Sequence, residues 1–276
     1  MGRPRLGHIR FINCMPLYYG MEKRESLLDI DLVEANPAEL ARELLAGTLD
    51  IAPIPAIEYA RHAGEFVLLP NIAISSFGEV QSILLLSKVP AEELSGRAVA
   101  LADTSRTSQV LTRVLLERRF GVVCAYTEMA PDPTAMLSEY DAALLIGDEA
   151  LKAYWNPPGK VHVYDLGKEW TTWTGLPMVY AVWAVRRSFA EQNAETADRV
   201  ASALNDSLAY CRRHLDEISE HAAMREQLDA ERLRSYFDAL HFRFEPEYRK
   251  GLVRYLSEAV AIGQLERVPI IEVLGE

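Results

Sequence analysis

Short apolar runs alternate with segments of helical periodicity along the first 62 residues. A short apolar run predicts a strand, whereas apolar residues three or four apart predict a helix with one buried face. The predicted strands cover 6–11, 31–35 and 51–53, and the predicted helices cover 14–23, 37–46 and 56–62. Pro37 at the start of the second helix and Gly47 at its end are typical helix boundaries. This β-α-β-α-β order predicts a parallel sheet with helices on its faces.

The same alternation returns in the middle of the chain. Predicted strands cover 98–101, 122–126, 142–146 and 161–165, and predicted helices cover 107–120, 133–139 and 148–155. Longer apolar runs at 82–87 and 178–185 bracket this unit, and the chain after residue 188 is almost wholly helical in period. We therefore expect two α/β lobes joined by paired crossover strands, although two domains in sequence would give a similar pattern. Ligands of open α/β sheets bind beyond the carboxyl ends of the strands, so the residues after each strand are the candidates.

Composition limits the kind of partner that the chain can bind. The 276 residues are 49% hydrophobic and 25% charged, which is enough to bury one large core or two smaller ones. The net charge of −11 argues against an extended surface for nucleic acid or an anionic membrane. A small anion in a cleft remains compatible with this charge, because distant surface charges are screened over about 10 Å.

Cysteines, histidines and the N-terminus bear on location and metal binding. Cys14, Cys124 and Cys211 lack CxxC spacing, which indicates a reducing compartment. We therefore expect neither a disulfide framework nor a zinc site. The six histidines show no ligand spacing, so we expect no metal site. The basic residues 1–6 lead directly into a predicted strand, and no apolar run approaches the roughly 20 residues that span a bilayer. We expect a cytoplasmic protein without a signal peptide.

Three strand-to-helix junctions carry candidate chemistry. Asn13 stands where a helix start attracts anions, or it simply caps that helix; the adjacent Cys14 is interpreted as a buried, inert thiol. The stretch 103–108 gathers four hydroxyl groups and one guanidinium group at a predicted helix start, which is the densest donor cluster in the chain. Gly147 permits close approach of the backbone, and Asp148 either orients a substrate hydroxyl or caps its helix.

A fourth segment, the aromatic stretch 170–177, either walls a cleft or packs in the core.

At these segments the sequence resembles the chorismate dehydratase family, which has the fold of type 2 periplasmic binding proteins and opens the futalosine route to menaquinone. The stretches that carry the resemblance are GHIRFINCMPLYYG (7–20), GTLDIAPIPAIEY (47–59), QSILLLS (81–87), ADTSRTS (102–108), LLIGDEAL (144–151) and TWTGLPMVYAVWA (172–184). The resemblance implies a two-lobed α/β fold, with one lobe formed by 1–85 and 179–276 and the other by 86–178. It implies that chorismate binds between the lobes.

The resemblance also implies a reaction and its residues. The enzyme would be a carbon–oxygen lyase (hydro-lyase) that removes water from chorismate to give 3-[(1-carboxyvinyl)oxy]benzoate, with no metal, nucleotide or redox cofactor. The residues expected to bind substrate are Ser82, Ser105, Arg106, Thr107, Ser108 and Gly147, and the candidate catalytic residues are Asn13 and Asp148. Because Asn13 is a neutral amide, we expect the enolpyruvyl carboxylate of the substrate to take the C3 proton, with Asp148 as the alternative base.

Two other interpretations remain open. A sibling of the family, 1,4-dihydroxy-6-naphthoate synthase, carries a histidine base at the position of Gly147, so this glycine favours the dehydratase. A solute-binding protein for a small anion would share the fold but work outside the cytoplasm, and fold alone does not settle function. Neither nucleic acid nor membrane is an expected partner, and the chain is expected to be a monomer or a homodimer.

Overall fold

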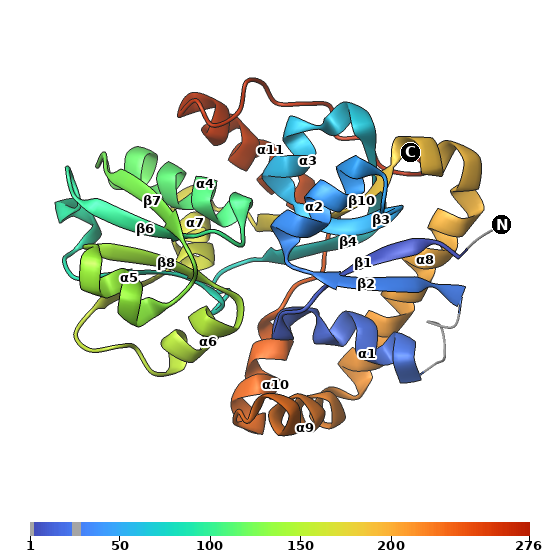
Figure 1. Cartoon of the computed structure of the whole chain (residues 1–276), viewed down its shortest axis with the longest axis horizontal. Coiled ribbons are helices and arrows are strands. Elements are labelled where there is room, and N and C mark those ends of the chain that lie inside the picture. The colour runs from blue at the N-terminus through green and yellow to red at the C-terminus, as the bar shows by residue number, and fades with distance from the viewer. Residues whose placement is uncertain (1–2, 24–28) are drawn as a thin grey trace.

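The computed structural model, which describes residues 3–23 and 29–276, contains two five-stranded sheets flanked by helices (Figure 1). The first sheet has the order β2-β1-β3-β10-β4, formed by Asp31–Ala35, Arg5–Ile9, Ile51–Pro55, Met178–Arg186 and Phe66–Ser76. The second has the order β7-β6-β8-β5-β9, formed by Ala125–Met129, Ala98–Ala102, Ala142–Ile146, Ile83–Ser87 and His162–Asp165. The prediction of two α/β lobes is confirmed.

Each sheet has four strands that run in one direction and one that runs against them. In the first sheet β1 is parallel to β2 and β3, while β10 is antiparallel to its neighbours β3 and β4. In the second sheet β6 is parallel to β7 and β8, while β5 is antiparallel to β8 and β9. The reversed strands β5 and β10 are the ones that enter from the other lobe, so the largely parallel character predicted for each sheet holds. The boundary expected at residue 85 falls inside β5, which belongs wholly to the second sheet.

Helices cover both sheets and form the last third of the chain. They are α1 Met15–Lys23, α2 Pro37–Ala46, α3 Ala56–Arg61, α4 Arg106–Val114, α5 Pro133–Glu139, α6 Gly147–Trp155, α7 Leu166–Thr174, α8 Arg187–Arg213, α9 Leu215–Glu226, α10 Ala230–Ala239 and α11 Pro246–Ala261. The predicted bounds of α2 are confirmed, since Asn36 and Glu39 form a capping box and Gly47 ends the helix at φ +78°. Within the described residues, no helix is long and apolar enough to cross a membrane. The basic stretch at the N-terminus is described only from Arg3 onward.

The strand β4 and the helix α7 were not predicted from the sequence. The apolar run of β4 is interrupted by Pro70 and by Asn71, which has φ +59°, so its strand pattern is broken. In α7 the buried Trp170 donates from its indole nitrogen to the carbonyl of Pro177 at 3.2 Å. This places Trp170 in the core beside the crossover strands, which resolves the open alternative for the stretch 170–177 in favour of packing.

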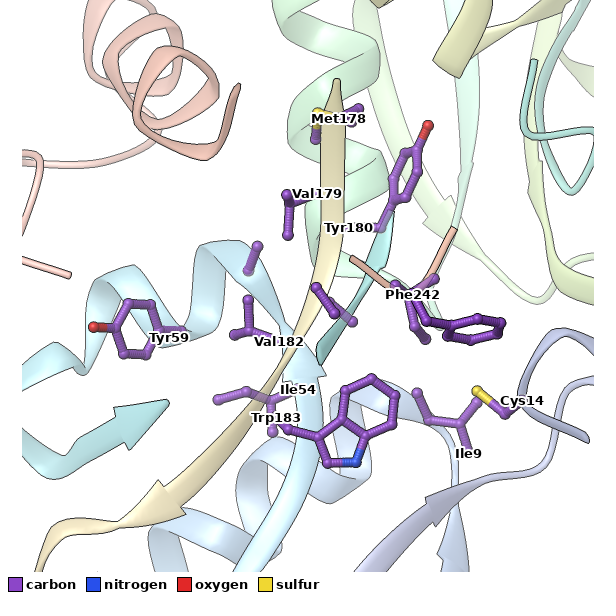
Figure 2. Packing of buried hydrophobic residues seen from close by; sticks show 14 of the residues in the cluster. Ile9, Cys14, Ile54, Tyr59, Met178, Val179, Tyr180, Val182, Trp183 and Phe242 are labelled. Carbon is purple, nitrogen blue, oxygen red and sulfur yellow. The ribbon is translucent and has the colours of Figure 1, made fainter. Parts of the chain in front are cut away.

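The crossover strand β10 forms the centre of the hydrophobic core. All its residues from Met178 to Val185 are buried, and they belong to one cluster with buried residues of both lobes. In Figure 2 the indole ring of Trp183 lies among buried neighbours that include Ile54 of β3 and Phe242. Because this cluster runs through β10, the two lobes share one continuous hydrophobic core.

Candidate functional site

The carboxyl ends of strands from both lobes meet around a small cavity. Its volume is about 40 Å³. The lining residues from the first lobe are Ile9, Phe11, Asn13, Pro37, Pro55, Ile74, Tyr180 and Ala181, and those from the β4–β5 connection and the second lobe are Ser82, Ile83, Ser105, Ser108, Ile146 and Gly147. Five of the residues predicted for the site are therefore brought together: Asn13, Ser82, Ser105, Ser108 and Gly147. We call this space the inner cavity.

Asn13 lies in a 3₁₀ turn, Ile12–Cys14, that joins β1 to α1. The interpretation of Asn13 as the N-cap of a helix is wrong, because Phe11 precedes this turn and Asn13 lies inside it. Its Oδ1 is buried and, among the residues that the structure describes, has no hydrogen-bond partner. A buried acceptor without a partner costs free energy, so a ligand hydroxyl that donates to Oδ1 would relieve that cost.

The start of α4 presents two serines to the inner cavity. Ser105 is the N-cap residue of α4, and its Oγ lies 3.0 Å from the Oγ of Ser108. Backbone N–H groups and the positive end of the helix dipole add to these hydroxyl groups. This helix start can therefore hold one carboxylate group of a ligand.

Two residues of the same cluster point elsewhere. Arg106 donates to Glu128 Oε2 at 2.5 Å and to Gln109 Oε1 at 3.1 Å. Thr107 is fully buried, and its Oγ1 accepts a hydrogen bond of 3.3 Å from the backbone N–H of Ile57 in the first lobe. The structure thus places Arg106 on the far side of the α4 start and Thr107 in the contact between α4 and α3.

Arg106 lines a second, larger space beside the inner cavity, which we call the outer cavity. Its volume is about 610 Å³. It is lined by Asn36, Ala38, Glu39, Ala41, Arg42, Leu45, Glu58, Asp103, Thr104, Arg106 and Glu128. The two cavities adjoin where Asn36 and Pro37 begin α2 and where Ser105 and Arg106 begin α4. Arg106 and Asn13 therefore face neighbouring spaces and not a common one.

Asp148 is directed at the first lobe. It stands in the first turn of α6, whose N-cap residue is Ile146, so the interpretation of Asp148 as an N-cap is wrong. Its Oδ1 accepts a hydrogen bond of 3.0 Å from the backbone N–H of Ile12 across the lobes. Burial raises the pKa of Asp148 to about 6, although the Ile12 N–H opposes the shift.

Gly147 allows the lobes to approach closely. Its φ is +64°, and a Cβ atom at this position would lie 3.0 Å from the ring of Phe11. Phe11 and Pro55 follow or end strands β1 and β3, so the rule that ligands bind beyond strand ends points to both, although neither was predicted. Tyr180 lies within β10, where that rule provides no signal.

Two other reactive side chains near the site are the thiol of Cys14 and the imidazole of His8. Burial raises the pKa of the Cys14 thiol, which fits the expected inert cysteine. Burial lowers the pKa of His8 to about 4, and its ring packs against Tyr18 at a centroid distance of 3.8 Å. Within residues 3–23 and 29–276, no group of three or more His, Cys, Asp or Glu side chains could hold a metal ion.

Comparison with known sequences identifies relatives that match nearly the full length of the chain. A family model described as menaquinone biosynthesis matches residues 4–261. Chorismate dehydratase of Thermus thermophilus is 31% identical over 271 residues, which cover 93% of this chain and 95% of the relative. The 1,4-dihydroxy-6-naphthoate synthase of the same organism is 24% identical over 269 residues, which cover 94% of each chain.

Solved structures share the two-lobed architecture. A protein of Archaeoglobus fulgidus matches with a TM-score of 0.76 and 21% identity, covering 95% of this chain and 98% of that one. The periplasmic aliphatic sulphonate binding protein SsuA of Escherichia coli matches with a TM-score of 0.67 and 19% identity, covering 99% and 94%. The fold is therefore that of the periplasmic binding proteins. The inner cavity lies between the two lobes.

Proposed function

The chain belongs to the menaquinone biosynthesis family, and on this premise we propose that it removes water from chorismate to give 3-[(1-carboxyvinyl)oxy]benzoate. The reaction is that of a hydro-lyase, and we assign it to the futalosine route in the cytoplasm. The observation that carries this proposal is the pair of polar groups in the inner cavity, the unpartnered Oδ1 of Asn13 and the hydroxyl of Ser82. Both suit a substrate that loses a hydroxyl group.

The inner cavity supplies groups for the ring carboxylate and for the departing hydroxyl. Chorismate carries a ring carboxylate, an enolpyruvyl ether at C3 and a hydroxyl at C4. Loss of the C3 proton moves charge into the ring carboxylate, which the start of α4 with Ser105 and Ser108 stabilises. The C4 hydroxyl donates to Asn13 Oδ1, while Ser82 donates a hydrogen bond to the same departing oxygen. Hydroxide then leaves C4 and combines with the proton removed from C3 to give water, and the ring becomes aromatic.

Binding requires the lobes to part and close again. The inner cavity of about 40 Å³ has room for only a few water molecules, which is much less than chorismate occupies. Arg106 in the outer cavity is paired with Glu128, and once the lobes separate its guanidinium group exchanges that partner for a carboxylate of the substrate. Closure then excludes water from the reacting atoms.

We propose that the enolpyruvyl carboxylate of the substrate takes the C3 proton. The carboxyl group of Asp148 faces the backbone N–H of Ile12, which supports the substrate as base over this side chain. His8 packs against Tyr18 and lines a different pocket, together with residues that include Glu34 and Arg225. A base supplied by the substrate explains how a cavity lined by neutral polar groups performs a proton abstraction.

Replacement Asp148→Asn is expected to lower kcat by less than about 10-fold, because the introduced amide still offers an acceptor to the Ile12 N–H. The kcat of the unchanged protein is expected to stay flat through pH 6. If Asp148 were the base, its pKa of about 6 would make kcat fall as the pH drops through that value and the carboxylate becomes protonated. Steady-state rates of both proteins against pH measure this. A loss of about 10²–10⁴-fold in Asp148→Asn would make Asp148 the general base.

The proposed function is tested by incubating the purified protein with chorismate and following the benzoate product by absorbance and mass spectrometry. Formation of 3-[(1-carboxyvinyl)oxy]benzoate is the expected result. Chorismate that is bound and recovered unchanged would favour a solute-binding protein. Chorismate that is neither bound nor changed would contradict the proposal, and turnover of the naphthoate synthase substrate would then favour the sibling activity.

A further inference from the structure

Ser82 is contacted by a buried tyrosine that comes from a distant part of the chain. The hydroxyl of Tyr236 in α10 donates to Ser82 Oγ at 2.8 Å. Tyr236 is 1% exposed and Ser82 is 2% exposed, so this hydrogen bond is shielded from solvent. A shielded bond in a medium of low dielectric constant is stronger than the same bond in water.

The backbone around Ser82 is held independently of Tyr236. The carboxylate of Asp165 accepts hydrogen bonds from the N–H groups of Val80 at 3.0 Å and Gln81 at 2.6 Å. Gln81 has φ +61°, and the carbonyl of Ser82 accepts from the N–H of Gly147 at 2.9 Å. With the backbone fixed on both sides, the rotation of the Ser82 side chain about χ1 is the freedom that remains.

A serine hydroxyl has one donor hydrogen and two acceptor lone pairs. Tyr236 occupies one lone pair, and among the described residues the hydroxyl hydrogen of Ser82 has only a long contact of 3.3 Å with the carbonyl of Val80. A ligand oxygen in the inner cavity offers a better acceptor for that hydrogen. The hydrogen bond that Ser82 receives also polarises its own O–H group and strengthens the bond that it donates.

We propose that Tyr236 is a positioning residue for the dehydration, which fixes the hydroxyl of Ser82 so that it donates to the departing C4 oxygen. This inference rests on the proposed function. Burial raises the pKa of Tyr236, so its phenol stays protonated and remains a donor throughout the physiological range. Tyr236 reaches Ser82 from α10 in the helical third of the chain, which gives that region a part in the reaction beyond covering the first sheet.

Replacement Tyr236→Phe keeps the ring in the core and removes the hydrogen bond. We expect kcat on chorismate to fall about 10-fold and KM to change less than about 2-fold, because the substrate carboxylates are bound elsewhere. The matched control is Tyr59→Phe, which removes a buried hydroxyl that binds the backbone of Glu272 far from the cavity. This control is expected to leave kcat and KM unchanged. An unchanged kcat in Tyr236→Phe would overturn the inference.

A double variant separates positioning from a general loosening of the fold. If Tyr236 acts through Ser82, Tyr236→Phe has no further effect on kcat in a Ser82→Ala background. The same roughly 10-fold loss in both backgrounds, together with a raised KM, would indicate a purely structural role and overturn the inference.

A crystal structure of Tyr236→Phe tests the inference apart from the proposed activity. The Ser82 side chain is expected to occupy more than one rotamer while its backbone stays in place. A single unchanged rotamer would overturn the positioning role even if chorismate is the substrate. If the unchanged protein leaves chorismate unprocessed while Ser82 occupies several rotamers in Tyr236→Phe, the proposed function is contradicted. The positioning of Ser82 by Tyr236 is then still supported.

Discussion

Replacement Asn13→Ala is expected to lower kcat on chorismate by about 10²–10³-fold, which is the usual cost of removing one well-aimed polar group from an active site. The buried Oδ1 of Asn13 is an acceptor in the inner cavity that has no donor among the described residues. Without it the C4 hydroxyl loses its orientation toward Ser82. Since binding of the ring carboxylate by the start of α4 is retained, the change should appear mainly in kcat.

The same replacement is expected to leave the free energy of unfolding unchanged or slightly higher, because it removes a buried acceptor that has no partner in the described chain. Lower activity at undiminished stability is typical of a residue kept for function. Urea unfolding and steady-state kinetics measure the two effects. The matched control is Asn205→Ala in α8, whose amide donates to the carbonyl of Ala201 away from the cavity. An Asn13→Ala protein with kcat within about 3-fold of the original would contradict the assigned role.

The sequence predicted most of the fold because its local signals agreed with one another. In α2 the proline, the capping residues and the terminal glycine all indicate the same helix, and the structure has the predicted bounds. In β4 a proline and a left-handed asparagine interrupt the pattern, and the strand was missed because its stability comes from pairing with β10. Local patterns therefore missed a strand that its neighbours stabilise. The helix α7 was also missed, although Asp165 caps its start and Gly175 ends it.

Part of the candidate site was also predictable from local patterns, whereas contacts between residues distant in sequence were not. The strand-end rule led to Asn13, Ser105 and Gly147, which do line the inner cavity. The direction of Arg106 toward Glu128 depends on a residue 22 positions away. The contact of Tyr236 with Ser82 joins residues 154 positions apart. No spacing along the chain encodes such contacts, because they arise only when elements that are distant in sequence pack together.

Replacement Gly251→Ala is expected to lower the free energy of unfolding by about 3 kcal/mol. Helix propensity alone predicts the opposite, since alanine in a helix interior is favoured over glycine by about 1 kcal/mol. In α11, however, a Cβ atom on Gly251 would clash with the backbone oxygen of Pro177, just before β10. That oxygen also accepts from the indole of Trp170 at 3.2 Å, so it is held in place and α11 must move away.

Equilibrium unfolding in urea measures this change, and Gly64→Ala is the matched control. Within the described chain and apart from its two neighbours in sequence, no heavy atom lies within 4 Å of a Cβ placed on Gly64, so the stability of this variant should change by less than about 1 kcal/mol. A Gly251→Ala protein as stable as the control would contradict the close packing of α11 on the segment that leads into β10. The expected loss instead identifies Gly251 as the residue that lets a C-terminal helix support the crossover strand, and with it the relative position of the two cavity walls.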